Sequence, residues 1–484
     1  MEDITTLDNR LSIEKSSPGR RALKFKGRLK HSAPPIPENL RRKTAPRLAE
    51  LSEFDVVRHF TRLSKINFSL DSHFYPLGSC TMKYNPRVNE DIAALDGFTG
   101  LHPMAPDEAA QGTLECLYNL QTLLCELCGM EAITLQPAAG AHGEFAGLMA
   151  AKAYFAHKNQ KDRVEVIVPD SAHGTNPASA AMLGFSSINI DSGPDGRVDL
   201  EVLKRHLGPK TAVVMLTIPN TLGIFESGIE TISKMVHEAG ALVYMDGANF
   251  NAMIGMIKPG ELGVDIMHLN MHKTFSTPHG GGGPGAGAIA VKKYLDAYLP
   301  VPVIKKEGNR YCADFNRPLS IGKVKAFFGN TGVLLKAYAY LLMHSPRELG
   351  EISENAIINA NYAKALLKDY YPSHSKDHCM HECVLAPSPE MMAKEITTLD
   401  VAKRLLDYGF HAPTIYFPHI AHEAIMIEPT ETETRETVEE FASAMKKISA
   451  EALNNPQKLK DAPQTMPVKR LDEVQAARQP NLRW

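Results

Sequence analysis

The chain has 484 residues, of which 44% are hydrophobic and 22% are charged. This composition is typical of globular proteins, and a chain of this length can bury a large core, so intrinsic disorder is excluded as its main state. The 53 Lys and Arg residues nearly balance the 55 Asp and Glu residues, and the resulting net charge of −2 gives no support for a nucleic-acid partner.

The cysteine content and the N-terminus both bear on the compartment in which the protein works. Seven cysteines are too few, and an odd number, for a disulfide framework, which favours a reducing compartment. The first residues are acidic and include no apolar segment, so we expect no secretory signal. No apolar stretch approaches the roughly 18 residues of a membrane span. We therefore expect a cytoplasmic protein with no membrane contact.

Residues 1–85 are interpreted as an N-terminal arm followed by a helical lead-in. Residues 1–50 are polar and repeatedly interrupted by proline, so we expect an extended arm that lies on another surface. A disordered tail is the alternative interpretation.

Residues 86–330 are predicted to form a large domain. Leucines keep helical spacing over residues 112–128, and Gly129 is expected to end that helix. Short apolar runs then alternate with helical segments, which favours an α/β fold with a doubly wound, mostly parallel sheet. Strands are expected at residues 164–168, 212–218, 241–245, 264–269 and 286–291, with helices at 200–207 and 231–239.

The pattern changes after about residue 330. Long helices are followed by a strand-like run at residues 383–385, a helix at 398–408 and a strand at 424–427. We therefore predict a small α+β domain at residues 331–454. Residues 455–484 are polar and are expected to be a tail that packs in an extended form or stays mobile.

Four features fall where ligands bind in such a sheet, outside the carboxyl ends of its strands. Small residues that include Gly140 and Ala141 open a helix expected at about 144–157, and their free N–H groups can hold a phosphate. His173, Asp246 and Lys273 each follow a different predicted strand. Taken singly, each has an ordinary explanation: a tight turn, a structural histidine, a capped turn or a solvated lysine.

Taken together, the four features are the parts of a pyridoxal phosphate (PLP) site. Lys273 would form the Schiff base, and Asp246 would pair with the pyridine nitrogen and keep it protonated, so that the ring can accept electrons. His173 would lie flat on the ring. Burial and neighbouring cationic groups would help the Lys273 amine to lose its proton.

Several longer segments resemble one known family. Residues 268–279, HLNMHKTFSTPH, resemble the PLP-lysine segment of the glycine cleavage system P-protein. Residues 75–83, YPLGSCTMK, resemble a signature of subunit 2 of the split bacterial and archaeal form of that protein. Further similar segments are residues 219–223, 246–249, 409–414 and 427–430. Several motifs in the same order, spanning most of the chain, are more specific than any single one.

The resemblance implies a PLP-dependent transferase of fold type I, with a mostly parallel, seven-stranded-type sheet in the large domain and a small α+β C-terminal domain. It also implies that Thr221, Ala248 and His272 join the predicted cofactor contacts, and that no metal is required. The implied enzyme is a glycine dehydrogenase that decarboxylates glycine with PLP. The remaining carbanion attacks the lipoyl disulfide of H-protein and transfers an aminomethyl group to it.

The implied partners belong to one multiprotein system. They are glycine, lipoylated H-protein, and a subunit 1 that lacks the PLP lysine and joins this chain in an α2β2 heterotetramer. The T-protein and L-protein of the same system complete the set. Because Lys273 is present, the resemblance assigns this chain to the cofactor-bearing subunit.

Some positions depart from the expected family pattern. Ile218 stands where a polar residue is expected before Pro219, and Lys323 and Lys325 stand where Arg is expected. Lysine is a point charge without the two-pronged geometry of arginine, so this segment is a weak candidate for clamping a carboxylate. Residues 79–83 are another candidate for binding the substrate carboxylate.

Two further motifs invite other interpretations. The glycines at 280–283 are not followed by a Walker-type Lys-Ser/Thr and lead into a strand, so we interpret them as a flexible stretch beside the cofactor. A group of histidines and cysteines matches no standard zinc spacing, and structural or surface roles are favoured. Its members are His374, His378, Cys379, His381 and Cys383.

Rival functions remain open from the residues alone. Another fold type I enzyme is one alternative. An aminotransferase should have an arginine in the small domain to bind the substrate carboxylate, and only Arg404 is available for this. A cysteine desulfurase needs a mobile catalytic cysteine. A non-catalytic scaffold subunit is the other alternative, against which the intact Lys273, Asp246 and His173 argue.

Overall fold

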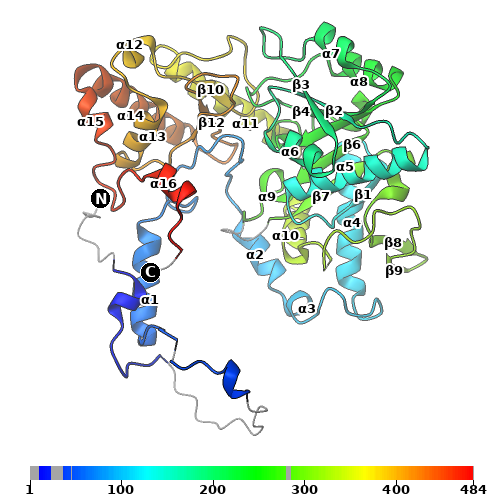
Figure 1. Ribbon diagram of the computed structural model, residues 1–484, viewed down its shortest axis with the longest axis horizontal. Coiled ribbons are helices and arrows are strands. Elements are labelled where there is room, and N and C mark those ends of the chain that lie inside the picture. The colour runs from blue at the N-terminus through cyan, green and yellow to red at the C-terminus, as the bar shows by residue number, and fades with distance from the viewer. Residues whose placement is uncertain (1–9, 23–35, 45, 280–284, 327, 483–484) are drawn as a thin grey trace.

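The computed structural model describes residues 10–22, 36–44, 46–279, 285–326 and 328–482. Figure 1 shows a part built around a large sheet, a smaller C-terminal part beside it, and an N-terminal segment that extends away from both. In the described residues, no helix is long and apolar enough to cross a membrane.

Seven strands form the large sheet, in the order β1-β7-β6-β5-β4-β2-β3. The strands from β6 to β3 run parallel, whereas β7 is antiparallel to both β6 and β1. Their bounds are β1 Ala132–Thr134, β2 Glu165–Pro169, β3 Ser186–Ile190, β4 Thr211–Thr217, β5 Leu242–Gly247, β6 Ile266–Asn270 and β7 Gly287–Val291. The mostly parallel sheet is confirmed. Strands β1 and β3 were not predicted, because β1 has only three residues and β3 is a half-exposed edge strand.

Both faces of this sheet are covered, which explains why its strands are continuous apolar runs. Val213 and Tyr244 point into the core on one face, and Val214 and Val243 point into the core on the other. The helices of this part are α4 Gln111–Cys128, α5 Gly140–His157, α6 Thr175–Met182, α7 Leu200–His206, α8 Ile229–Glu238, α9 Met271–Thr274 and α10 Thr331–Leu342. A hairpin of β8 Val303–Glu307 and β9 Arg310–Asp314 lies beside α4.

The C-terminal part is built on a three-stranded sheet in the order β10-β12-β11, with its own apolar core. Its strands are β10 Cys383–Leu385, β11 Thr414–Ile415 and β12 Ile425–Ile427. Its helices are α11 Pro346–Leu367, α12 Pro389–Met392, α13 Thr398–Asp407, α14 Arg435–Asn454, α15 Pro456–Lys460 and α16 Glu473–Arg478. The domain boundaries inferred from the sequence stay a prediction.

The residues before the large sheet include α1 Glu53–Lys65, which lies in the extended segment, and α2 Arg87–Ala93 and α3 Asp96–Thr99, which lie with the sheet part, α2 against α10. Helix α1 projects from the body of the molecule in Figure 1 and exposes Phe54, Val57 and Phe60. Part of the predicted arm, at residues 1–9, 23–35 and 45, lies outside the described residues.

Residues 75–85, which we call the strap, run between the sheet part and the C-terminal part. Leu77 forms a β-bridge with Ile427 of β12, and the Thr414 hydroxyl donates to the Gly78 carbonyl at 2.7 Å. On the other side, the Ser276 hydroxyl donates to the Tyr84 carbonyl. The strap is therefore held by both parts.

Three local details differ from the sequence expectations. Helix α5 begins at Gly140, one turn before the expected start, so the glycine-rich segment forms its first turn. Asp246 lies within β5, at its carboxyl end, and does not follow that strand. Residues 455–484 include α15 and α16, and Leu459 is fully buried, so this segment is neither simply extended nor mobile along its whole length.

Candidate functional site

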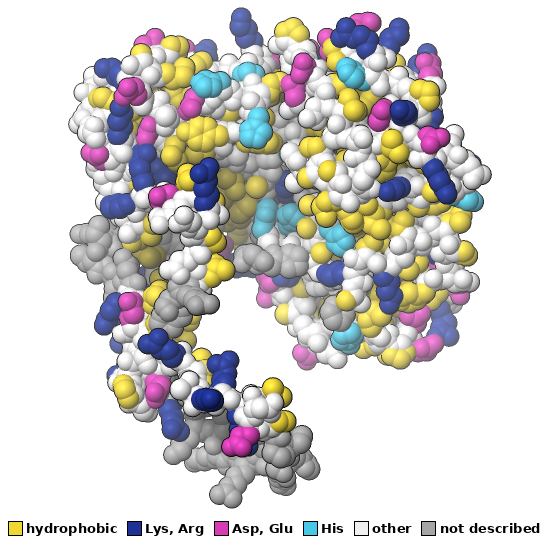
Figure 2. Space-filling model, in the orientation of Figure 1, with side chains coloured by type: hydrophobic (Ala, Val, Ile, Leu, Met, Phe, Trp, Pro, Cys, Tyr) yellow, Lys and Arg dark blue, Asp and Glu magenta, His cyan; other side chains and the backbone are white. Residues whose placement is uncertain are grey.

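The carboxyl ends of the parallel strands bring the predicted site residues to one edge of the sheet. His173 lies just after β2, Thr221 lies after β4, Asp246 ends β5, and Lys273 lies in α9 directly after β6. This edge faces the C-terminal part, and Figure 2 shows histidine side chains gathered at the hollow between the two parts. The parallel topology therefore assembles the chemistry that the sequence only suggested.

Asp246 is fully buried, and four donors reach its carboxylate. His173 Nδ1 and Asn176 Nδ2 lie 2.8 and 3.1 Å from Oδ2. His268 Nε2 and the backbone nitrogen of Ala248 lie 3.2 and 2.8 Å from Oδ1. Burial alone would raise the pKa of Asp246, but the two histidines and the hydrogen bonds outweigh burial and lower that pKa well below its usual value. The carboxylate therefore keeps its negative charge.

A second buried acid lies close to Asp246. Glu144 of α5 accepts hydrogen bonds from the hydroxyls of Thr175 at 2.8 Å and Ser179 at 3.3 Å. Burial and the neighbouring charge of Asp246 raise the pKa of Glu144 to about 8. Glu144 is therefore mostly neutral at pH 7, and Asp246 is the charged acid of the two.

Lys273 is buried, with 8% of its surface exposed, and it contacts the strap. Its Nζ donates to the carbonyl oxygen of Ser79 at 2.7 Å. The hydroxyl of Ser79 lies 2.8 Å from His173 Nε2, whose Nδ1 contacts Asp246. Lys273, Ser79, His173 and Asp246 thus form one continuous polar path.

The N-terminus of α5 opens at the same edge of the sheet. Its N-cap, Ala139, offers no side-chain hydrogen bond to the first turn, so the N–H groups there are available to an anion. A Cβ on Gly140 would lie 2.3 Å from the side-chain nitrogen of Asn270, so a larger residue there would displace that side chain. Burial and the charge of Lys325 lower the pKa of His142 in this turn, which places a lysine cation near the helix end.

The other residues predicted to contact the cofactor interact with other groups of the chain. The Thr221 hydroxyl donates to the Ser171 carbonyl at 2.8 Å, and His272 Nδ1 lies 3.3 Å from the Ala286 carbonyl. Ala141 is exposed in the first turn of α5, and Ala248 N is already bonded to Asp246. Their roles toward a cofactor stay predictions.

Sequence reasoning missed two acids of the C-terminal part that reach this site. Glu382 Oε2 accepts the N–H of Ser79 at 2.7 Å, and Glu428 Oε2 accepts the N–H of Thr81 at 3.0 Å. Ser79 and Thr81 both have left-handed backbone angles, with φ of 66° and 43°, which are uncommon for residues other than glycine. Only the resemblance of residues 427–430 to a family motif pointed toward one of these acids.

The histidines and cysteines at residues 374–383 differ in burial, and the side chains of Cys379 and Cys383 contact each other. His374 and His378 are exposed, whereas Cys379, His381 and Cys383 are buried. Among the residues that the structure describes, one group with metal-ligand spacing contains His381 together with Glu382 and Glu428, and neither group contains a cysteine. The surface or structural roles favoured from the sequence stay a prediction. The other stretch interpreted from its composition, at residues 280–283, lies outside the described residues.

The arginine considered for an aminotransferase is already engaged. Arg404 of α13 forms ion pairs with Glu451 at 2.8 Å and with Asp407 at 2.9 Å. These contacts hold the guanidinium within the C-terminal part, so it is not available to a substrate carboxylate.

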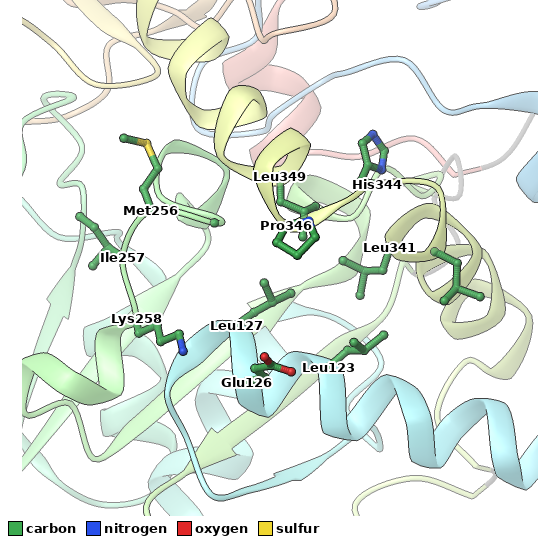
Figure 3. Close-up of a pocket in the computed structure, with 12 residues that line it drawn as sticks. Leu123, Glu126, Leu127, Met256, Ile257, Lys258, Leu341, His344, Pro346 and Leu349 are labelled. Carbon is green, nitrogen blue, oxygen red and sulfur yellow. The ribbon is translucent and has the colours of Figure 1, made fainter.

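A separate cavity of about 460 Å³ lies between α4, α10 and the start of α11 (Figure 3). Its walls are mostly apolar and hold none of the predicted site residues. They are formed by Leu123, Glu126, Leu127, Gly255, Met256, Ile257, Lys258, Leu341, Leu342, His344, Pro346 and Leu349.

Comparison with known sequences gives consistent matches along the chain. The family model for the glycine cleavage system P-protein matches residues 29–308, and the model for the C-terminal domain of glycine dehydrogenase matches residues 352–469. A probable glycine dehydrogenase (decarboxylating) subunit 2 from Caldanaerobacter subterraneus is 56% identical over 449 residues, covering 93% of this chain and 92% of the relative. A protein of the same name from Pseudothermotoga lettingae is 53% identical, covering 98% of this chain and 99% of the relative.

Comparison with solved structures identifies the type of fold. A crystal structure of glycine decarboxylase (P-protein) in an inhibitor-bound form has a TM-score of 0.73 at 21% identity, covering 85% of this chain and 93% of that one. A cysteine desulfurase from Thermococcus onnurineus has a TM-score of 0.60 at 15% identity, covering 78% of this chain and 95% of that one. The fold is that of fold type I PLP enzymes, as expected from the sequence.

Proposed function

The chain belongs to the glycine cleavage system P-protein family, and we propose that it is the cofactor-bearing subunit 2, which decarboxylates glycine and transfers the aminomethyl group to the lipoyl group of H-protein. The observation that carries this proposal is the path from Lys273 through Ser79 and His173 to an ionised Asp246. A scaffold subunit without chemistry would have no need to bury these charged groups together.

The cofactor in this proposal is PLP, and the residues at the sheet edge fit it. The uncapped N-terminus of α5, at Gly140 and Ala141, would hold the phosphate, and Lys273 would bind the aldehyde carbon. Buried polar atoms of Asn270, Thr274 and Thr277 near the lysine have no hydrogen-bond partner in the described residues, which suits a polar ligand there. When bound, the protonated pyridine ring supplies an electron sink for the carbanion left by loss of CO2.

Asp246 has the task of holding a proton on the pyridine nitrogen. A carboxylate offers about four acceptor positions, and all four have donors here. A pyridinium N–H must therefore displace one of them. His173 is the donor with some surface exposure, whereas Asn176 is fully buried, so we expect His173 to move from Asp246 to the face of the ring.

His268 keeps Asp246 oriented from the other side. Burial lowers the pKa of His268 despite the attraction of Asp246, which favours the neutral ring. Its Nε2–H can then donate to Asp246, while its Nδ1 accepts from the Tyr244 hydroxyl at 3.0 Å. This fixed tautomer holds the carboxylate without adding a positive charge that would compete with the ring proton.

The partners follow from the family and are part of the proposal. A subunit 2 implies a subunit 1, and an α2β2 heterotetramer is the proposed assembly. Lipoylated H-protein is the proposed acceptor, and the T-protein and L-protein act in the same system. A cytoplasmic location, expected from cysteine usage, suits the free state of all seven cysteines.

The test is exchange of the glycine carboxyl group with labelled CO2. The purified chain, loaded with PLP, should exchange slowly alone and rapidly once subunit 1 and lipoylated H-protein are added. Full activity of this chain alone would contradict the split-enzyme assignment. Release of sulfide from cysteine, or transamination of a keto acid at a comparable rate, would favour the rival fold type I enzymes.

A further inference from the structure

The strongest unexplained feature is a group of three buried polar side chains behind the strap: Glu382, Glu428 and His381. None of the three has any exposed surface. Glu382 Oε1, Glu428 Oε1 and both ring nitrogens of His381 have no hydrogen-bond partner in the described residues. Buried polar atoms without partners are costly, so their presence calls for an explanation.

These atoms face one another. His381 Nε2 lies 3.9 Å from Glu382 Oε1 and 4.0 Å from Glu428 Oε1, distances too long for hydrogen bonds. The other oxygen of each carboxylate is taken by the strap, at Ser79 N and Thr81 N. Each acid therefore has one oxygen fixed on the backbone and one turned toward a shared spot.

The shared spot is linked to the amine of Lys273 through the backbone of Ser79. Ser79 connects them, since its N–H binds Glu382 while its carbonyl accepts from Lys273 Nζ. The charge of Lys273 acts on Glu382, Glu428 and His381 alike. On the Asp246 side, the buried acids Glu144 and Asp246 are both held by hydrogen bonds, Glu144 by the hydroxyl groups of Thr175 and Ser179.

We propose that Glu382 and Glu428 are a proton-transfer pair for the exchange of amines at Lys273. The proposal rests on the proposed function. A substrate such as glycine arrives with an ammonium group, R–NH3⁺, which must lose one proton before its nitrogen can attack. That proton passes to the carboxylate pair, and the pair returns it to the Lys273 nitrogen when the latter is released as a free amine. The proton count balances, and no oxidant or reductant is needed.

The electrostatics of the pair suit this role. Burial raises the pKa of Glu428 to about 7, and burial together with the charge of Glu428 raises the pKa of Glu382. Burial lowers the pKa of His381 to about 3, so its ring adds no charge. A general base works best with a pKa near the working pH. The other titratable groups that act on the pair are Lys273, Cys80, Cys379 and Glu431.

The first test uses the cofactor-free chain and the pH dependence of its Tm. The folded pKa of Glu428 lies above the usual 4.5, so ionisation favours the unfolded chain. Stability should therefore fall as pH rises from about 4.5 to about 7. The variants Glu382→Gln and Glu428→Gln should each reduce this fall, and the double variant should remove the contribution of the pair. The control for the exchange measurement is Glu433→Gln, a partly buried acid outside the site; because its pKa is also raised to about 7, this variant should reduce the fall in stability as well.

The second test measures amine exchange directly in the PLP-loaded chain. Methylamine or glycine is mixed rapidly with the enzyme, and the cofactor absorbance change gives the exchange rate. The double variant should be slowed by roughly 10²–10⁴-fold, the range of general acid–base catalysis, and each single variant by less, because one acid remains. The control should match the unsubstituted chain.

Two outcomes would overturn the proposal. One is a double variant with the exchange rate of the control and the pH dependence of the unsubstituted chain. The other is stoichiometric binding of Zn²⁺ to the cofactor-free chain that is lost in Glu382→Gln, which would assign the cluster to a metal. Failure of the proposed function looks different: methylamine would exchange normally and depend on both acids, while glycine would release no CO2 even with subunit 1 and lipoylated H-protein present. If the double variant does not fold, the single variants provide the same comparison.

Discussion

Replacing Asp246 by Asn tests the central electrostatic argument. The substitution keeps the shape of the side chain and removes its charge. An amide offers one acceptor oxygen where the carboxylate offers two, so two of the four donors around Asp246 lose their acceptor. At about 1.5–3 kcal/mol for each hydrogen bond to a charged group, the folded chain should lose about 3–6 kcal/mol of stability.

The effect on rate follows from the ring proton. Without the buried negative charge of Asp246, protonation of the pyridine nitrogen is less favourable. The carbanion is then harder to form. We expect glycine–CO2 exchange to fall by roughly 10²-fold or more, which corresponds to about 2.7 kcal/mol. The assay compares exchange per folded molecule, with bound PLP measured by absorbance.

A matched control separates the two effects. Asp265 is also buried, and it accepts from His237 Nε2 at 2.8 Å and from the Val243 N–H at 2.7 Å. It lies just before β6, at the opposite edge of the sheet from Lys273. Asp265→Asn should lower the Tm but leave the exchange rate per folded molecule unchanged. Equal rates in the two variants would refute the role given to Asp246.

Three further predictions concern the lysine, the strap and the partly buried pair of His237 and Asp265. Lys273→Ala should lose turnover and let PLP leave on dialysis; a retained imine absorbance band would mean that another amine holds the cofactor. Gly78→Ala should lower both the Tm and glycine exchange, because a Cβ there would lie 2.2 Å from Met426 Cγ and 2.7 Å from its backbone oxygen; an unchanged Tm would show that the strap tolerates displacement. The hydrogen bond to Asp265 raises the pKa of His237, so its stabilisation is present below about pH 6.5 and is lost as pH rises through the raised pKa. As pH rises above that value, the Tm of His237→Gln should fall less than the Tm of the unsubstituted chain. An equal fall in both would exclude the pair as a source of stability.

The parts of the fold that the sequence predicted are those encoded by local pattern. The buried strands are continuous apolar runs because both faces of the sheet are covered, and Gly129 ends α4 in the left-handed conformation that the pattern indicated. Asp246 and Lys273 were predictable as neighbours because parallel strands bring their carboxyl ends to one edge. What local pattern could not provide was the start of α5 within the glycine-rich turn or the half-exposed edge strand β3.

The acids behind the strap, Glu382 and Glu428, could not be predicted from local sequence pattern. Glu382 precedes the short strand β10, and Glu428 follows β12, so each could equally be a surface residue of a small domain. Their proposed role depends on Ser79 and Thr81, which contact them only in the folded chain. Composition and periodicity carry no information about such pairings, and the family resemblance named motifs without naming their contacts.

The position of the strap has a consequence for the order in which the chain folds. Ser79 lies 94 residues from His173, 194 from Lys273 and 303 from Glu382, and Thr81 lies 347 residues from Glu428. Contacts between such distant segments form late, because the intervening chain must first be ordered. A nascent polypeptide that has not yet reached the second glutamate cannot complete the site, although it already carries the lysine. Binding of the coenzyme should therefore be one of the last steps of folding. During refolding, it should occur later than formation of the large sheet.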